Sequence, residues 1–231
     1  MDELLTEDQE AERAKRWVRE NGAFLLAGIV LGLGGLFGWQ AWQDSRLETA
    51  GEASLVWQRL QDAVEGERYN EVDETLNVLA TDYAATPYLD QARLLLARMY
   101  MTRNDPESAA AELRSLLDGG NDPYLRRLAA LRLAQVQMHQ EDYQAALATL
   151  GPTEQSALQS QYHDLRGDAF SGLGELEQAR DAYQQALDTD LTGVIDRGFV
   201  QIKLDDVLGS LAASAEPAAR PAEAGTSVDA D

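Results

Sequence analysis

The chain has 231 residues and carries 40 Asp and Glu against 19 Lys and Arg, a formal net charge of −21. This acidic balance excludes a nucleic-acid-binding protein, because neutralising phosphates requires an excess of cations. Cysteine is absent, which excludes disulfides, thiolate metal sites and a lipid-modified cysteine.

The segment 23–42 is apolar and rich in glycine. No charged residue lies between Glu20 and Asp44, and the length of the segment matches the thickness of a bilayer core. Its Leu, Ile, Val and Phe residues together favour membrane insertion by roughly 3–5 kcal/mol. Trp39 and Trp42 lie at its end, where the headgroup region favours amphipathic rings. We therefore predict a transmembrane helix over 23–42.

Two other interpretations of this segment fit less well. A buried soluble helix would carry interior glycines that each cost about 0.8–1 kcal/mol relative to Ala. A cleaved signal peptide needs a shorter apolar core that is followed directly by small residues. The chain instead places the bulky Trp39 after the core, and the small residues Gly51 and Ala53 lie too far downstream.

The cations that flank the segment predict its orientation. Four Lys and Arg lie within residues 1–22, whereas only Arg46 and Arg59 lie within about 20 residues after the segment. We therefore expect a cytoplasmic N-terminal segment over 1–22 and a domain outside the cytoplasm from residue 43.

Three glycines of the segment fall on one face of a helix. Gly28, Gly32 and Gly35 have the spacing that lets another membrane helix approach closely. The alternative is the ordinary enrichment of glycine in membrane helices, and the sequence leaves both interpretations open.

Beyond the apolar segment, apolar residues recur at helical spacing, and Gly, Pro and Asn interrupt them. The pattern has no strand-like alternation and predicts an all-α domain over 43–208. In chain order, we expect helices over 44–66, 70–83, 88–103, 106–117, 123–139, 142–150, 155–172, 175–188 and 194–208.

Three of the expected helix pairs share small residues at matching positions. The stretch LRGDAFSGLGELEQARDAYQQAL has the spacing of a tetratricopeptide repeat. Frames that lie 33 and then 37 residues earlier bracket the usual 34-residue period and recover small residues again. The small packing positions are Ala97, Ala109, Ala134, Ala146, Gly167 and Ala179. Since small residues let antiparallel helices approach, stacked pairs should form an α-solenoid.

The last expected helix, 194–208, should cap the solenoid. We expect its contacts with the rest of the domain to come from Val194, Phe199, Ile202 and Val207. Ala, Pro and Ser dominate residues 209–231, a composition that predicts a disordered tail.

Motifs for catalysis, cofactor binding or metal binding are missing from the sequence. It contains no nucleophile elbow, phosphate-binding loop, dinucleotide fingerprint, calcium loop or HExxH motif. His163 and Asp164 could form a catalytic pair, but adjacent residues of a helix point to different faces. We therefore predict no catalytic, cofactor or metal site.

Three stretches carry a family resemblance: KRWVRENG before the apolar segment, GWQAW at its end and LRGD in the third repeat pair. With the organisation over residues 10–208, they resemble the ancillary subunit of the bacterial Sec translocon, a single-span inner-membrane protein of Gram-negative bacteria. The resemblance implies a periplasmic tetratricopeptide-like domain without an active site. The partners that it implies are the Sec channel, a membrane-anchored periplasmic chaperone of the prolyl-isomerase type, and exported client proteins.

Three functions are compatible with this organisation. The first, which the resemblance favours, is a membrane-tethered scaffold or chaperone adaptor that assists exported proteins as they leave the channel. The second is a coordinator of envelope assembly or stress signalling, whose repeats recruit cell-wall or regulatory partners. The third is an enzyme, for which His163 and Asp164 are the only candidate residues.

Overall fold

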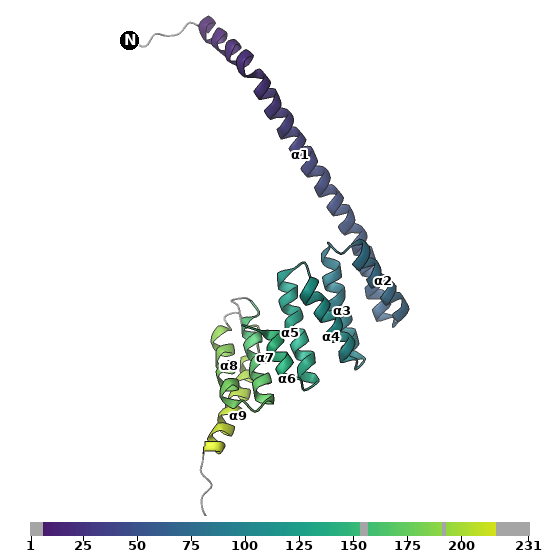
Figure 1. Ribbon diagram of the computed structural model, residues 1–231, viewed down its shortest axis with the longest axis vertical. Helices are drawn as coiled ribbons and strands as arrows, with labels where there is room; N and C mark the ends of the chain where they lie inside the picture. Colours follow the sequence, from purple (N-terminus) through teal and green to yellow (C-terminus); the bar gives the residue numbers. More distant parts are fainter. Residues whose placement is uncertain (1–6, 153–156, 191–192, 216–231) are drawn as a thin grey trace, which may run out of the picture.

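The computed structural model describes residues 7–152, 157–190 and 193–215, and these residues form an all-helical chain. A long helix, α1 (Glu7–Glu65), projects from a stack of shorter helices (Figure 1). The other helices of the described residues are α2 (Tyr69–Asp82), α3 (Pro87–Thr102), α4 (Pro106–Gly119), α5 (Pro123–His139), α6 (Tyr143–Leu150), α7 (Gln159–Gly172), α8 (Leu176–Thr189) and α9 (Arg197–Ala215). The expected all-α fold is confirmed.

Helix α1 corrects the expected division between a helix over 23–42 and a second helix over 44–66. Both segments lie in one helix, because residues 41–50, which join them, contain neither Pro nor Gly. The axis bends by 47° between Ala11–Phe24 and Leu26–Glu65. No single helix of the described chain has the length and hydropathy of a membrane span, but these two segments together do.

The C-terminal part of α1 is the first helix of the stack. It packs against α2, and each following helix packs against the next one along the chain as far as α9. Figure 1 shows this stack running from α2 to α9, while the N-terminal part of α1 extends away from it. The short connections between the helices favour packing between sequence neighbours.

The turns inside the helix pairs repeat one geometry. Glu67, Asn104, Glu141 and Gly174 each adopt a positive φ, and they are separated by 37, 37 and 33 residues. In each turn the next residue's amide donates to a carbonyl five residues earlier, as from Asp105 to Tyr100. The left-handed residue ends one helix and sends the chain back antiparallel to it. The stack therefore contains four equivalent pairs, the first of which is α1 with α2.

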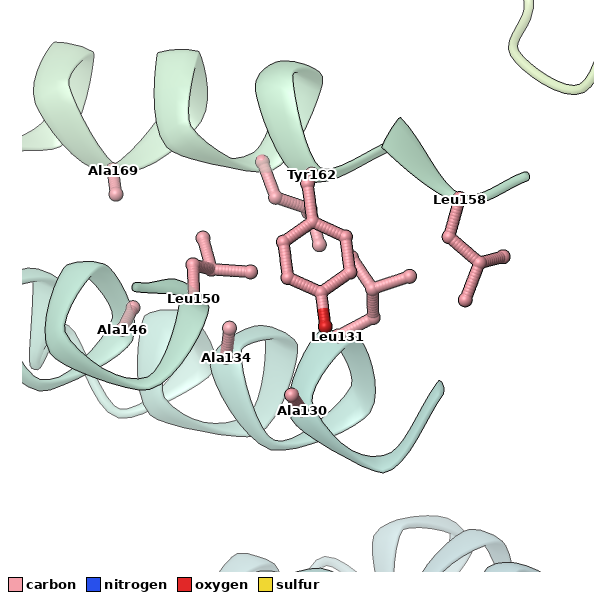
Figure 2. Packing of buried hydrophobic residues seen from close by; sticks show 9 residues of the cluster. Ala130, Leu131, Ala134, Ala146, Leu150, Leu158, Tyr162 and Ala169 are labelled. Carbon is pink, nitrogen blue, oxygen red and sulfur yellow. The ribbon is translucent and has the colours of Figure 1, made fainter. Parts of the chain in front are cut away.

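Buried apolar residues form one core region for each interface along the stack. Figure 2 shows the region between α5, α6 and α7, where the ring of Tyr162 points from α7 toward α5. The Tyr162 hydroxyl donates to the carbonyl of Arg127 at 2.9 Å, which satisfies the polar end of a buried ring. Each helix pair thus completes its core only with its neighbours.

The capping helix α9 differs from the expectation in the face that it buries. Val200, Leu204 and Val207 are buried against α8, and of the four expected contacts only Val207 is among them. Phe199 is 56% exposed and Ile202 is 65% exposed. Residues 200, 204 and 207 share one helical face, whereas 199 and 202 lie on another, so packing against α8 selects only one of two apolar faces.

The capping helix is also longer than expected. It continues through Ala215, because Leu211 still packs against the last core region and the adjoining alanines favour a helix. The expected start of the disordered tail at residue 209 is therefore wrong. The rest of the expected tail, residues 216–231, lies outside the described residues.

Candidate functional site

The small packing positions all lie inside the helix stack. Five of them are alanines of which at most 4% is exposed, and the sixth is the buried glycine of α7. A Cβ added to Gly167 would overlap the ring of Tyr183 on α8. In the first pair, the turn at Glu67 aligns Leu60 and Val72 with Ala97 and Ala109, which lie 37 residues later, and both side chains are buried. Larger residues in place of both alanines hid this pair in the sequence.

The glycines of the apolar segment have a different environment. Gly28, Gly32 and Gly35 are exposed, and a Cβ on any of them would have no neighbour within 4 Å in the part of the chain that the structure describes. They lie on one face of α1, which leaves that face open to another helix. Their role in helix pairing stays a prediction.

A groove formed by two adjoining pockets crosses α3, α5, α7 and α9. The α3–α5 pocket has a volume of about 520 Å³, and the α7–α9 pocket has a volume of about 360 Å³. The two pockets share Leu128, Arg132 and Gln135 of α5, so one continuous surface connects them. A groove on a helical solenoid is the kind of surface that binds a segment of another protein.

The α3–α5 pocket is apolar inside and basic at its edge. Its apolar lining is Leu94, Ala97, Met101, Leu113, Leu128 and Val136. Arg98 and Arg132 add two positive charges, and both residues are exposed. Arg132 donates a hydrogen bond of 3.0 Å to Gln135. Within the described parts of the chain, neither arginine has a carboxylate within 4.0 Å.

The α7–α9 pocket contains an ion network. Lys203 of α9 lies 2.9 Å from Asp164 and 2.8 Å from Asp168, both of α7. The Tyr183 hydroxyl of α8 donates to Asp168 at 2.8 Å. Burial by itself would lower the pKa of Lys203, but the hydrogen bonds and charges of the two carboxylates outweigh it and raise that pKa. Burial and Asp168 raise the pKa of Tyr183. Lys203 and Tyr183 therefore both remain protonated at neutral pH.

The groove has a repeated position whose charge changes along the stack. Arg98, Gln135 and Asp168 each directly follow the small packing residue of their helix and line the groove. Their side chains run from positive through neutral to negative. The sequence analysis did not predict this series, although it could have been recognised from the residue that follows each small packing position.

The structure separates His163 from Asp164. His163 is buried, its Nδ1 atom has no hydrogen-bond partner among the described residues, and burial together with Arg166 lowers its pKa. Asp164 faces the groove and bonds Lys203. The described part of the chain also contains no group of three or more His, Asp or Glu side chains that could hold a metal ion. Asp164 is thus paired with Lys203, and the structure does not show it paired with His163.

Known proteins resemble this chain over most of its length. A family model described as a tetratricopeptide repeat-like domain matches residues 15–209. An ancillary SecYEG translocon subunit of Escherichia coli (strain K12) is 31% identical over 87% of this chain and 96% of its own length. A protein of the same name from Aggregatibacter actinomycetemcomitans is 28% identical over 88% and 98%. A third, from Haemophilus influenzae, is 28% identical over 79% and 89%.

Proposed function

Because the chain belongs to the family of ancillary SecYEG translocon subunits, we propose that it acts beside the Sec channel as a non-enzymatic scaffold. The apolar part of α1 anchors it in the inner membrane with residues 1–22 in the cytoplasm. The helix stack lies in the periplasm and acts there as a chaperone adaptor for exported proteins that leave the channel. This topology is supported by the exposed apolar residues of α1 and by the larger number of Lys and Arg directly before them than directly after them.

The observation that carries this proposal is the continuity of α1. Ala53, Leu60 and Ala63 of α1 are fully buried, and Leu60 and Ala63 belong to the first core region. The helix that we place in the membrane is therefore itself part of the stack. At 1.5 Å per residue, roughly 16 Å of helix separates Trp42 from Ala53. A rigid connection of this length would hold the groove close to the channel exit and raise its local concentration near emerging chains.

The proposed partners bind two different parts of the chain, the apolar part of α1 and the groove of the helix stack. The face with Gly28, Gly32 and Gly35 would contact a membrane helix of the channel or of a membrane-anchored chaperone of the prolyl-isomerase type. The groove over α3, α5, α7 and α9 would bind a segment of that chaperone or of an exported client. Tethering makes weak binding in the groove sufficient, because both partners are confined to the same region.

Isolation of the full-length protein from inner membranes in mild detergent tests the proposal. We expect the Sec channel to be recovered with the parent protein. Gly32→Leu fills the glycine face, so less of the channel should be recovered with this variant. Gly51→Leu is the matched control, because it makes the same change on α1 outside the apolar segment. Recovery of cell-wall or regulatory proteins without the channel would instead favour a coordinator of envelope assembly or stress signalling.

A pair of insertions after Asp44 tests the role of the rigid connection. A Gly-Ser insertion would interrupt α1, whereas an alanine-rich insertion of two helical turns would lengthen it and keep the orientation of the stack. We expect crosslinking of an arrested exported chain to the groove to fall with the flexible insertion and to persist with the helical one. Equal crosslinking in both variants would contradict the proposed role of α1.

A further inference from the structure

We propose that the α3–α5 pocket binds a partner segment in which large apolar side chains alternate with carboxylates. The inference rests on the proposed function, because it names the chemistry of the partner segment that the groove would hold. It depends on three features of the pocket, which are its apolar interior, its two arginines and its position in an acidic chain.

The interior of the pocket suits large apolar side chains. Leu94, Met101 and Leu128 are only half-buried, although they face a hollow rather than the bulk surface. The volume of about 520 Å³ lies in the range of specific binding pockets. Covering this surface with an apolar side chain removes apolar area from water, which supplies the main favourable free energy of binding.

The two arginines define what lies beside that side chain. Arg98 comes from α3 and Arg132 from α5, so two separate helices contribute a guanidinium group to the lining of the pocket. Neither has a carboxylate partner in the described residues. A guanidinium group matches the planar geometry of a carboxylate and bonds it through two N–H groups. The pocket therefore presents two unused sites for carboxylates.

The charge of the rest of the chain makes this pocket selective. A net charge of −21 repels acidic segments from most of the surface. At the other end of the groove, Lys203 is already shared by Asp164 and Asp168, which leaves that network negative. An acidic segment would thus be directed to Arg98 and Arg132 and away from α7 and α9.

Two occupants from the chain itself fit this pocket less well. Residues 216–231 contain one valine as their only large aliphatic or aromatic residue, so this segment offers little to fill the apolar interior. A second copy of the chain would bring a further net charge of −21 against the first. A segment of a different protein is the occupant that the composition favours.

Three labelled peptides test the proposal against the full-length protein in detergent micelles. The first contains Asp-Leu-Asp-Leu-Asp between Gly-Ser flanks, and the other two replace Asp by Asn or by Lys. Fluorescence anisotropy measures the dissociation constants at low and at high salt. We expect the Asp peptide to bind about fivefold more tightly than the Asn peptide at low salt, because two exposed ion pairs form. The Lys peptide should bind more weakly than both, and high salt should reduce the differences.

Charge reversal in the pocket should invert the order of affinity of the Asp and Lys peptides. In the double variant Arg98→Glu with Arg132→Glu, the Lys peptide should bind more tightly than the Asp peptide. The matched control combines Arg114→Glu with Arg126→Glu, which changes the net charge equally at exposed arginines outside the pocket. This control variant should bind the peptides in the same order of affinity as the parent protein. The milder double variant Arg98→Gln with Arg132→Gln should bind the Asp and Asn peptides equally, and circular dichroism should show unchanged helix content throughout.

Several outcomes would overturn the proposal. Equal affinity for all three peptides, or the same response of pocket and control variants, would show that the arginines do not select carboxylates. Tighter binding of the Asp peptide after deletion of residues 216–231 would identify the chain's own segment as the occupant. Loss of peptide binding as the protein concentration rises would identify a second copy. These measurements need no Sec channel, so a failed co-isolation and a failed peptide preference are distinguishable.

Discussion

Substitution of Gly167 by alanine tests whether close approach of two helices defines the repeat. Gly167 of α7 faces the ring of Tyr183 on α8, and the added Cβ would overlap that ring. Tyr183 cannot easily move away, because it is 3% exposed and its hydroxyl is bonded to Asp168 at 2.8 Å. The substitution therefore requires a shift of the packed helices rather than a change of one rotamer.

Two opposing effects determine how much Gly167→Ala changes the free energy of unfolding. Overpacking of a core costs about 1–3 kcal/mol, whereas Ala in place of Gly inside a helix stabilises it by about 1 kcal/mol. The expected result is a net loss of about 1 kcal/mol, which lowers the Tm by roughly 2–4 °C in a chain of this size. Gly51→Ala is the matched control, because a Cβ there has no neighbour within 4 Å. It should raise stability by about 1 kcal/mol.

Thermal unfolding of the full-length protein, followed by circular dichroism, measures both variants under the same conditions. A second pair of variants isolates the contact between the two side chains. Tyr183→Phe keeps the ring, so Gly167→Ala should remain destabilising in that background. Tyr183→Leu removes the ring, so Gly167→Ala should become neutral or stabilising. An increase in Tm for Gly167→Ala equal to that for Gly51→Ala would refute the packing explanation.

Three further substitutions follow from buried or strained groups. Asp90 is buried and accepts the amides of Asn121 and Asp122, so Asp90→Ala should cost about 2–4 kcal/mol in chemical denaturation; a change below 1 kcal/mol would contradict this role. Glu141→Gly relieves the positive φ of 60° and should raise the free energy of unfolding by about 1 kcal/mol, and with it the Tm; a lower Tm would contradict this expectation. Because burial lowers the pKa of His163, the folded state binds the proton less well than the unfolded chain. Stability should therefore fall as pH drops below about 6.5, by at most about 1.4 kcal/mol per pH unit, and His163→Leu should remove that part of the slope.

The helices and the small packing positions could be predicted because they depend on local rules. Pro106 and Pro123 begin helices after capping aspartates, as the breakers between the apolar runs indicated. Ala134 and Gly167 recur at the repeat period because their helix pairs pack closely in the same way. The first pair could not be recognised from the sequence, because Leu60 and Val72 stand where the other pairs have small residues.

The groove could not be predicted in the same way, because its residues come together from separate helices. Arg98 and Arg132 belong to different repeats and show no common motif in the sequence. Lys203 lies 39 residues from Asp164 along the chain, and their ion pair forms because α9 packs on α8, which itself packs on α7. Charges at such separations carry no periodic signal that a sequence pattern could reveal.

The sequence by itself determined the helical fold, its period and the apolar segment before it, because these follow from the order of neighbouring residues. Only the tertiary structure decided that α1 runs without a break into the stack and that α9 turns Val200 rather than Phe199 inward. Both faces of α9 are apolar, so its rotation depends on the shape of α8. Local patterns specify which residues can be buried, and the packing of distant elements selects which of them are buried.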